Sequence, residues 1–300
     1  MLHSKYSTKK GFFALFIWSF SPLLASQLKS IPTFEMLSMI FAVSGLTILL
    51  KVCYYSEWYK LKQHFLLYII GIIGIYGNDL FYFEAFKHSP PTHVELINYL
   101  WPIFVIIFST MLPNKKIEWQ QILGSSLSFL GIYVLICSGT YTNFSYSYLK
   151  GYGLALADAL VWAFYVITVR HYKHKGQYSE VIGLYCLICA FFSLYGHLYS
   201  EVFVSPSFLE VITMCLLGIF SQGLAYILWE QSVKGGDYQL LSNMAYFTPV
   251  SSVCILIVFN KASLTVSLLI STLLISAGAF VANRSKLALI FKNKEHQLMG

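Results

Sequence analysis

Five carboxylates interrupt long apolar runs, and their chemistry is the first functional signal in the chain. They are Asp79, Glu84, Glu95, Asp158 and Glu230. An ionisable group inside an apolar segment is expensive unless it faces a cavity or a partner, so each is a candidate for holding a cation or carrying a proton. Asp79 lies deep in its run and is the best candidate. Glu230 lies near the end of its run and is the second.

The other three carboxylates have simpler explanations. Glu84 and Glu95 lie close in sequence to Lys87, His88 and His93, which predicts a solvated or ion-paired rim. Asp158 lies one residue from a stripe of small residues at a spacing of four, which indicates a helix-packing face. The members of this stripe are Gly151, Ala155, Ala159 and Ala163. The sequence leaves the role of Asp158 open.

A second signal is a tyrosine three residues before a proline, which occurs twice inside apolar runs. The motifs are NYLWP at 98–102 and AYFTP at 245–249. Proline removes a backbone hydrogen bond and kinks a helix, but neighbouring helices can satisfy the freed carbonyl in a membrane. A single proline would be explained by packing. The pair predicts that Pro102 and Pro249 are kinks beside a binding site, each next to its tyrosine.

Aromatic and amide side chains at the same depth complete the predicted site. Rings inside apolar runs can stack on an aromatic substrate or hold a cation over their faces, and some of them must simply face lipid. Asn98 and Asn243 can hydrogen-bond a carboxylate or an ammonium group. The predicted substrate-binding residues are Trp18, Asp79, Asn98, Tyr99, Trp101, Trp162, Glu230, Asn243 and Tyr246.

Several other kinds of site are not expected. No lysine or arginine falls in the middle of an apolar run, whereas a carrier of phosphorylated substrates would need fixed cations. The chain has no Gly-x-Ser-x-Gly and no His-Glu-x-x-His motif, so we predict no catalytic residue, no metal and no cofactor. Cys186 and Cys189 have zinc-like spacing but lack a second ligand pair, and packing explains them better. The substrate should be zwitterionic, neutral or cationic.

The elements that position these residues are predicted to be membrane-spanning helices. Of the 300 residues 57% are hydrophobic and 11% are charged, against about 25% charged in soluble domains. Runs of about 20 apolar residues are long enough to cross a bilayer, and they are continuous rather than alternating, which favours helices over a β-barrel. Ten such runs occur, at 11–29, 34–50, 65–86, 91–112, 118–138, 151–170, 181–200, 207–232, 238–259 and 263–283.

The distribution of positive charge predicts the orientation. Ten spans place both termini on one side, and that side carries sixteen lysine and arginine residues. The opposite side carries four, Lys29, Lys87, Lys150 and Lys261. Positive charge is typical of cytoplasmic loops, so both termini are predicted to be cytoplasmic. The net charge of +7 is then a topology signal rather than a sign of nucleic-acid binding.

The two halves of the chain carry an internal repeat. Tyr99, Pro102 and Gly131 each have a counterpart 147 residues later, at Tyr246, Pro249 and Gly278. Each half holds five predicted spans, an odd number, so the halves enter the membrane in opposite orientations. Inverted repeats with a site between them are typical of secondary transporters. We expect a first repeat at 1–140, a second at 148–284 and a cytoplasmic tail at 285–300.

Specific motifs add a family resemblance that covers nearly the whole chain. The ten-span plan, with a tryptophan in spans one and six, resembles the drug/metabolite transporter superfamily with its EamA-type repeats. The segments VELINYLWP at 94–102, AYILW at 225–229 and YFTP at 246–249 resemble the YddG-type aromatic amino acid exporters. Glu230 stands where such exporters usually have asparagine. The resemblance implies ten helices around a central cavity and alternating access.

The sequence thus predicts a multi-pass protein of the inner membrane that moves a small molecule. Export of aromatic or hydrophobic amino acids is the first hypothesis. Uptake of a cationic metabolite such as S-adenosylmethionine is the alternative within transport, and a polytopic membrane enzyme is the alternative of another class. The partners are the substrate and the lipid bilayer, with no nucleic acid, and a monomer is compatible with this plan.

Overall fold

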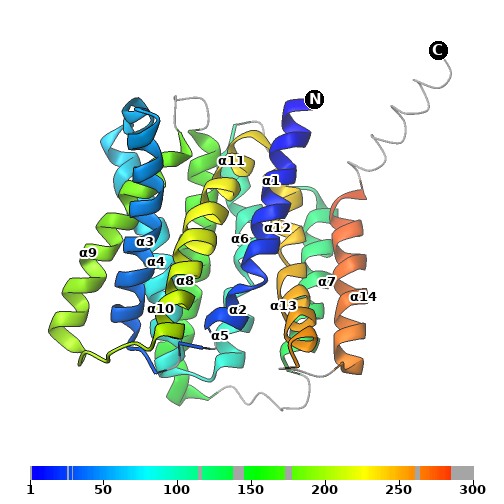
Figure 1. Ribbon diagram of the computed structural model, residues 1–300. Coiled ribbons are helices and arrows are strands. Elements are labelled where there is room, and N and C mark those ends of the chain that lie inside the picture. Colours follow the sequence, from blue (N-terminus) through cyan, green and yellow to red (C-terminus); the bar gives the residue numbers. More distant parts are fainter. Residues whose placement is uncertain are drawn as a thin grey trace.

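The computed structural model describes residues 2–25, 27–28, 30–113, 117–137, 145–172, 178–260 and 264–284. In these ranges every regular element is a helix, and the long helices run side by side across the molecule (Figure 1). The predicted all-helical membrane fold is confirmed. The helix α1 begins, and the helix α14 ends, on the same side, which we call the terminus side (Figure 1). The expected tail at 285–300 lies outside the described residues.

The helices fall into continuous and interrupted ones. The continuous long helices are α3 (Thr33–Tyr54), α4 (Phe65–His88), α7 (Trp119–Ile136), α8 (Leu149–His171), α9 (Ile182–Ser200) and α14 (Val266–Ala282). The interrupted ones are α1 (Leu2–Trp18) with α2 (Ser21–Ala25), α5 (Pro91–Asn98) with α6 (Trp101–Phe108), and α12 (Tyr238–Met244) with α13 (Phe247–Val258). The helix α10 (Phe208–Leu216) passes through a π-helical segment, η5 (Leu217–Ala225), into α11 (Tyr226–Gly235).

Each of the ten predicted spans coincides with a helix or an interrupted helix. Within the described residues, seven helical stretches are long and apolar enough to cross a membrane, and the bent pair α12–α13 raises the number to eight. The helices α1 and α14 have 17 residues each and fall just short of that length. The chain is therefore a multi-pass membrane protein, and the count of ten remains a prediction.

The boundary of the first span differs from the prediction. We expected it at 11–29, but α1 starts at Leu2 and the helix is interrupted after Trp18. Hydropathy marks where the apolar environment begins. A polar segment can still extend the helix beyond that point when a neighbouring element forms hydrogen bonds with its polar side chains. Lys10 Nζ donates to Gln231 Oε1 at 2.6 Å, and the backbone N–H of Asp237 donates to Thr8 Oγ1 at 3.0 Å. The polar turns of α1 are thus fixed to α11 and to the turn that follows it.

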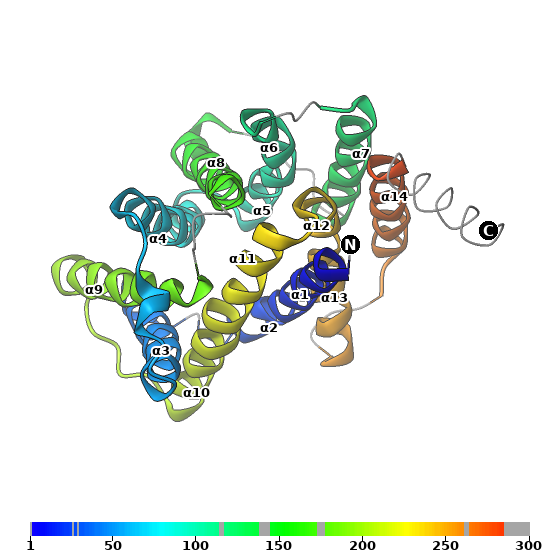
Figure 2. The same ribbon diagram turned by 90° about the horizontal axis from the view of Figure 1, so that it is seen from above.

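The helices pair in a reciprocal pattern. The helix α7 packs along α14, α3 along α9, α4 along α8, and α1 along α11 (Figure 2). The predicted fifth and second spans therefore meet the tenth and seventh, as a two-fold relation between the halves would require. The stripe of small residues on α8 is buried, and a Cβ at Gly151 would overlap Ser89 beyond the end of α4. The division into two repeats remains an inference from the sequence.

Candidate functional site

A cavity of about 720 Å³ lies among α1–α2, α3, α4, α5–α6, α8, η5–α11 and α13. Its lining reaches Thr33, Phe86 and Lys87, which occupy the ends of α3 and α4 on the side opposite the termini (Figure 1). The side chain of Lys87 is 42% exposed, so this end meets the surface. The other end of the cavity stops at Trp18, Trp101 and Trp162. Trp101 and Trp162 are buried, so the cavity reaches the surface at the Lys87 end and ends in the interior at these rings.

Four tryptophans from four helices close the inner end. The ring of Trp18 lies 6.1 Å from that of Trp162 and 5.4 Å from that of Trp229, measured between centroids. The ring of Trp101 lies 5.9 Å from Trp229 and 6.4 Å from Trp162. Tyr226 adds an edge contact to Trp18 at 5.6 Å. Such rings favour edge and offset contacts with another ring, so this tryptophan layer offers a surface for an aromatic substrate.

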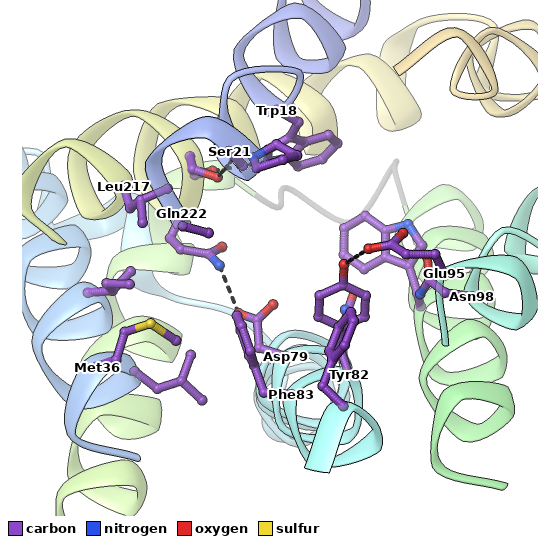
Figure 3. Close-up of a pocket in the computed structure, with 18 of the residues that line it drawn as sticks. Trp18, Ser21, Met36, Asp79, Tyr82, Phe83, Glu95, Asn98, Leu217 and Gln222 are labelled. Atoms are coloured by element: carbon purple, nitrogen blue, oxygen red, sulfur yellow. Dashed lines mark hydrogen bonds between the residues drawn. The ribbon is translucent and has the colours of Figure 1, made fainter. Parts of the chain in front are cut away.

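Carboxylate and amide groups line the walls. Gln222 Nε2 donates to Asp79 Oδ2 at 2.9 Å, and across the cavity the Tyr82 hydroxyl donates to Glu95 (Figure 3). Asn98 donates from its amide to Asp158, which is fully buried behind the lining. These contacts leave the walls rich in acceptors for a positive group.

Positive charge is confined to the mouth of the cavity. Among the described lining residues Lys87 alone carries a cationic side chain, and it forms an ion pair with Glu84. Because the deeper lining holds Asp79 and Glu95 without a fixed cation, the cavity is electrostatically suited to an ammonium group.

The π-helical segment η5 gives the wall its irregular shape. Its wider turns displace the backbone, so the Ser221 carbonyl accepts a hydrogen bond from Trp18 Nε1 at 3.2 Å. The hydroxyls of Ser21 and Ser221 lie 3.0 Å apart and join η5 to α2. Gly218 lets η5 approach α3, because a Cβ there would lie 2.7 Å from the Ile40 carbonyl oxygen. Segments of this kind occur often at functional sites.

Six of the nine predicted binding residues line this cavity. They are Trp18, Asp79, Asn98, Tyr99, Trp101 and Trp162. Glu95, which the sequence assigned to a rim, also lines the cavity, because α5 starts at Pro91 and carries the residue inward. Glu84 is ion-paired at the mouth, as predicted.

The other three predicted residues lie outside the lining. Tyr246 is fully buried in an apolar cluster with Ile132 and Val250. Asn243 Oδ1 accepts a hydrogen bond from Ser125 Oγ at 2.6 Å. Glu230 pairs with Lys234 at 2.9 Å, on the terminus side of the tryptophan layer. We therefore leave these residues out of the site proposed for the observed cavity.

Both proline motifs interrupt their helices. The helix α5 ends at Asn98 and α6 begins at Trp101, so Pro102 is the second residue of α6. The helix α12 ends at Met244 and α13 begins at Phe247, so Pro249 is the third residue of α13, after a bend of 42°. Tyr99 and Tyr246 lie in the breaks themselves. Both helices are interrupted at the motif, but of these two only the pair α12–α13 is bent by more than 40°, and of the two tyrosines only Tyr99 lines the cavity.

Several lining residues carried no strong sequence signal. Four of them are not among the residues predicted from the sequence, namely Gln222, Tyr226, Tyr82 and Ser21. Gln222 had one visible feature, since it is an amide in a long apolar run between Gly218 and Gly223. Its importance depends on the π-helical register, which hydropathy does not reveal.

Comparison with known proteins gives consistent results. The family model of the EamA-like transporter family matches residues 10–137 and 149–284. The aromatic amino acid exporter YddG of Ancylobacter novellus is 31% identical over 279 residues, covering 92% of this chain and 96% of its own. The exporters of that name from Escherichia coli and Salmonella typhimurium are 25% and 22% identical, covering 66% and 93% of this chain and 68% and 97% of their own.

A solved structure shares the fold. A protein described only as "Crystal structure of protein" superimposes with a TM-score of 0.88 at 30% identity, covering 95% of this chain and 99% of its own. The family and the names of the relatives indicate a membrane transporter and not an enzyme. Together with the helical bundle and its one-sided cavity, these matches show that the chain belongs to the EamA-like transporter family.

Proposed function

We propose that this membrane transporter exports aromatic or other hydrophobic amino acids by alternating access. The observation that carries the proposal is the cavity itself. A tryptophan layer forms its inner end, and a carboxylate–amide pair, Asp79 with Gln222, lies in its wall. An aromatic amino acid presents the matching groups, a ring at one end and an ammonium group at the other. Three relatives named as aromatic amino acid exporters support the same substrate class.

The geometry suggests a role for each group. Asp79 takes the ammonium group, because a charge-assisted hydrogen bond to a carboxylate is strong where water is scarce. The amides of Gln222 and Asn98 donate to the substrate carboxylate. The side chain of the substrate stacks on Trp18, Trp101 and Trp162 at the closed end. The positive loops support cytoplasmic termini, and the cavity then faces the outside, in the state that releases an exported substrate.

A second candidate is the uptake of a cationic metabolite. It is favoured by the two carboxylates of the lining, Asp79 and Glu95, against a single lysine at the mouth. A cation such as S-adenosylmethionine would use the same tryptophan faces through cation–π contacts.

Counterflow in proteoliposomes tests both candidates. Vesicles with purified protein are loaded with unlabelled amino acid or metabolite and diluted into a trace of radiolabelled compound. Accumulation of phenylalanine or tryptophan, and not of aspartate, is expected. Accumulation of S-adenosylmethionine without phenylalanine would favour the second candidate. If none of these compounds accumulates above empty vesicles, the proposed substrate class is wrong.

A further inference from the structure

Three buried polar groups lie outside the cavity lining, one on Trp229 within the tryptophan layer and two on the terminus side of that layer. The Tyr165 hydroxyl, the Trp229 indole N–H and one carboxylate oxygen of Glu230 have no hydrogen-bond partner among the described residues. These side chains are only 3%, 1% and 4% exposed. Burying a polar atom without a partner is costly and rare in folded proteins. A group of three such atoms therefore calls for an explanation.

The three side chains, which we call the cluster, come from two neighbouring helices. Trp229 and Glu230 are consecutive residues of α11. Tyr165 lies on α8, a helix that packs against α11, and the Tyr165 side chain is close enough to Glu230 to interact with it electrostatically. The ring of Tyr165 lies 5.6 Å from that of Trp162, which lies 6.3 Å from that of Trp229. The cluster therefore begins directly behind the closed end of the cavity.

A further tyrosine extends the cluster toward the terminus side. Tyr185 on α9 interacts electrostatically with Glu230, and its hydroxyl accepts a hydrogen bond from Gln63, which lies between α3 and α4. Both tyrosine rings lie on glycines of α4, since a Cβ at Gly74 would overlap Tyr165 and a Cβ at Gly71 would overlap Tyr185. The two rings thus pack directly against the backbone of α4.

Polar contacts at the helix ends close this region on the terminus side. Arg170, near the end of α8, donates to the carbonyls of Val233, Lys234 and Gly236 at 2.9, 2.7 and 3.2 Å. The guanidinium also lies 5.2 Å from the centre of the Tyr238 ring. These contacts tie the end of α8 to the end of α11. Water can replace each of them when the helices separate, so they suit a contact that breaks and re-forms.

We propose that Tyr165, Trp229 and Glu230 line the inward-facing half of the transport path and contact the substrate when the protein opens on the terminus side. The proposal rests on the proposed function. Lys234 holds one oxygen of Glu230, and the other accepts the substrate ammonium group. The Tyr165 hydroxyl and the Trp229 indole donate to the substrate carboxylate. The atoms without partners in the outward-facing state thus gain partners in the inward-facing one.

A matched pair of variants tests the role of the hydroxyl. Tyr165 and Tyr246 are both buried tyrosines whose hydroxyls lack a partner in the described part of the chain, but Tyr246 lies in a separate apolar cluster. Replacing either by phenylalanine removes an unsatisfied group, so both variants should unfold at the wild-type temperature or above. Phenylalanine counterflow should slow about three- to tenfold in Tyr165→Phe and stay at the wild-type rate in Tyr246→Phe. Wild-type rates in Tyr165→Phe, or equal losses in both, would overturn the proposal.

A labelling experiment tests the path without a substrate. Tyr165→Cys is introduced into a full-length chain whose six native cysteines are replaced by alanine, with and without Arg170→Ala. A membrane-impermeant maleimide applied from the terminus side should react several-fold faster when Arg170 is absent. A thiol that reacts from neither side, or only from the opposite side, would show that the path lies elsewhere. Because labelling needs no substrate, this result stands even if phenylalanine is not carried, and the two failures are distinguishable.

Discussion

At the scale of single residues, Asp79 carries the largest share of the proposed function. It lies in the middle of α4, is 7% exposed, and accepts one hydrogen bond from Gln222. A carboxylate in this position either binds the substrate ammonium group or helps only to hold η5 in place. The two roles predict different results for an isosteric amide.

Asp79→Asn should reduce phenylalanine transport at least tenfold while the protein remains folded. A hydrogen bond to a charged group contributes about 1.5–3 kcal/mol, and about 1.4 kcal/mol corresponds to a factor of ten. Counterflow rates and the elution profile of the purified protein measure the two effects. Glu84→Gln is the matched control, because Glu84 is ion-paired with Lys87 outside the lining. Normal transport by Asp79→Asn would reduce Asp79 to a structural hydrogen-bond acceptor.

Tyr99 tests the aromatic part of the site. It lies in the break between α5 and α6 and lines the cavity. A stacking or cation–π contact contributes about 0.5–2 kcal/mol, so Tyr99→Ala should weaken the binding of labelled phenylalanine by about two- to thirtyfold. Tyr133→Ala, on α7 and 43% exposed, should bind as the wild type does. Equal affinities in the two variants would remove Tyr99 from the proposed site.

At the scale of elements, the π-helical segment η5 decides the shape of the cavity wall. It directs Gln222 toward Asp79 and presents the Ser221 carbonyl to Trp18. This arrangement requires η5 to lie close to α3, which Gly218 permits. The position of η5 is therefore a packing property that a single methyl group can test.

Gly218→Ala should lower the unfolding temperature in detergent. The added Cβ would meet a backbone carbonyl oxygen of α3, which cannot turn aside as a side chain could. Overpacking of this kind costs about 1–3 kcal/mol. Gly153→Ala is the control, because nothing lies within 4 Å of the Cβ position on α8. There alanine should stabilise the helix by about 0.5–1 kcal/mol. If Gly218→Ala is as stable as the wild type, η5 does not depend on this close approach.

At the scale of the whole molecule, orientation connects the cavity to the direction of transport. The cavity opens opposite the termini, so it faces the outside only if the termini are cytoplasmic. That orientation rests on the lysine and arginine bias of the loops. Part of this bias comes from residues outside the described ranges, such as Lys115 and Lys173.

Thiol labelling of intact cells tests this orientation. Tyr146, before α8, is 94% exposed and lies on the side opposite the termini, whereas Tyr54, at the end of α3, is 82% exposed on the terminus side. A cysteine at position 146 should react with an impermeant maleimide, and one at position 54 should react only after permeabilisation. A variant with the native cysteines replaced gives the background signal. The reverse pattern would place the cavity mouth in the cytoplasm and contradict export from this state.

The sequence by itself determined the membrane class, the helical fold and the approximate depth of the six predicted residues that line the cavity. These properties follow from local composition, because each apolar run must form its own backbone hydrogen bonds in lipid. Asp79 could be selected because a carboxylate at that depth is unusual, and Tyr99 because it precedes one of the paired prolines. The breaks at the two proline motifs could also be predicted from local sequence, because proline acts on its own helix.

Only the tertiary structure decided which of these residues share a cavity. Hydropathy gives the depth of a residue but not its direction, so Tyr99 faces the cavity while Tyr246, from the matching motif, is buried in an apolar cluster. Glu95 lines the cavity instead of lying at its rim, and Glu230 lies on the terminus side of the tryptophan layer instead of in the cavity. The contribution of Gln222 came from the π-helical register of η5 and its packing on α3. Such directions are set by contacts between helices far apart in the sequence, and a local pattern does not contain them.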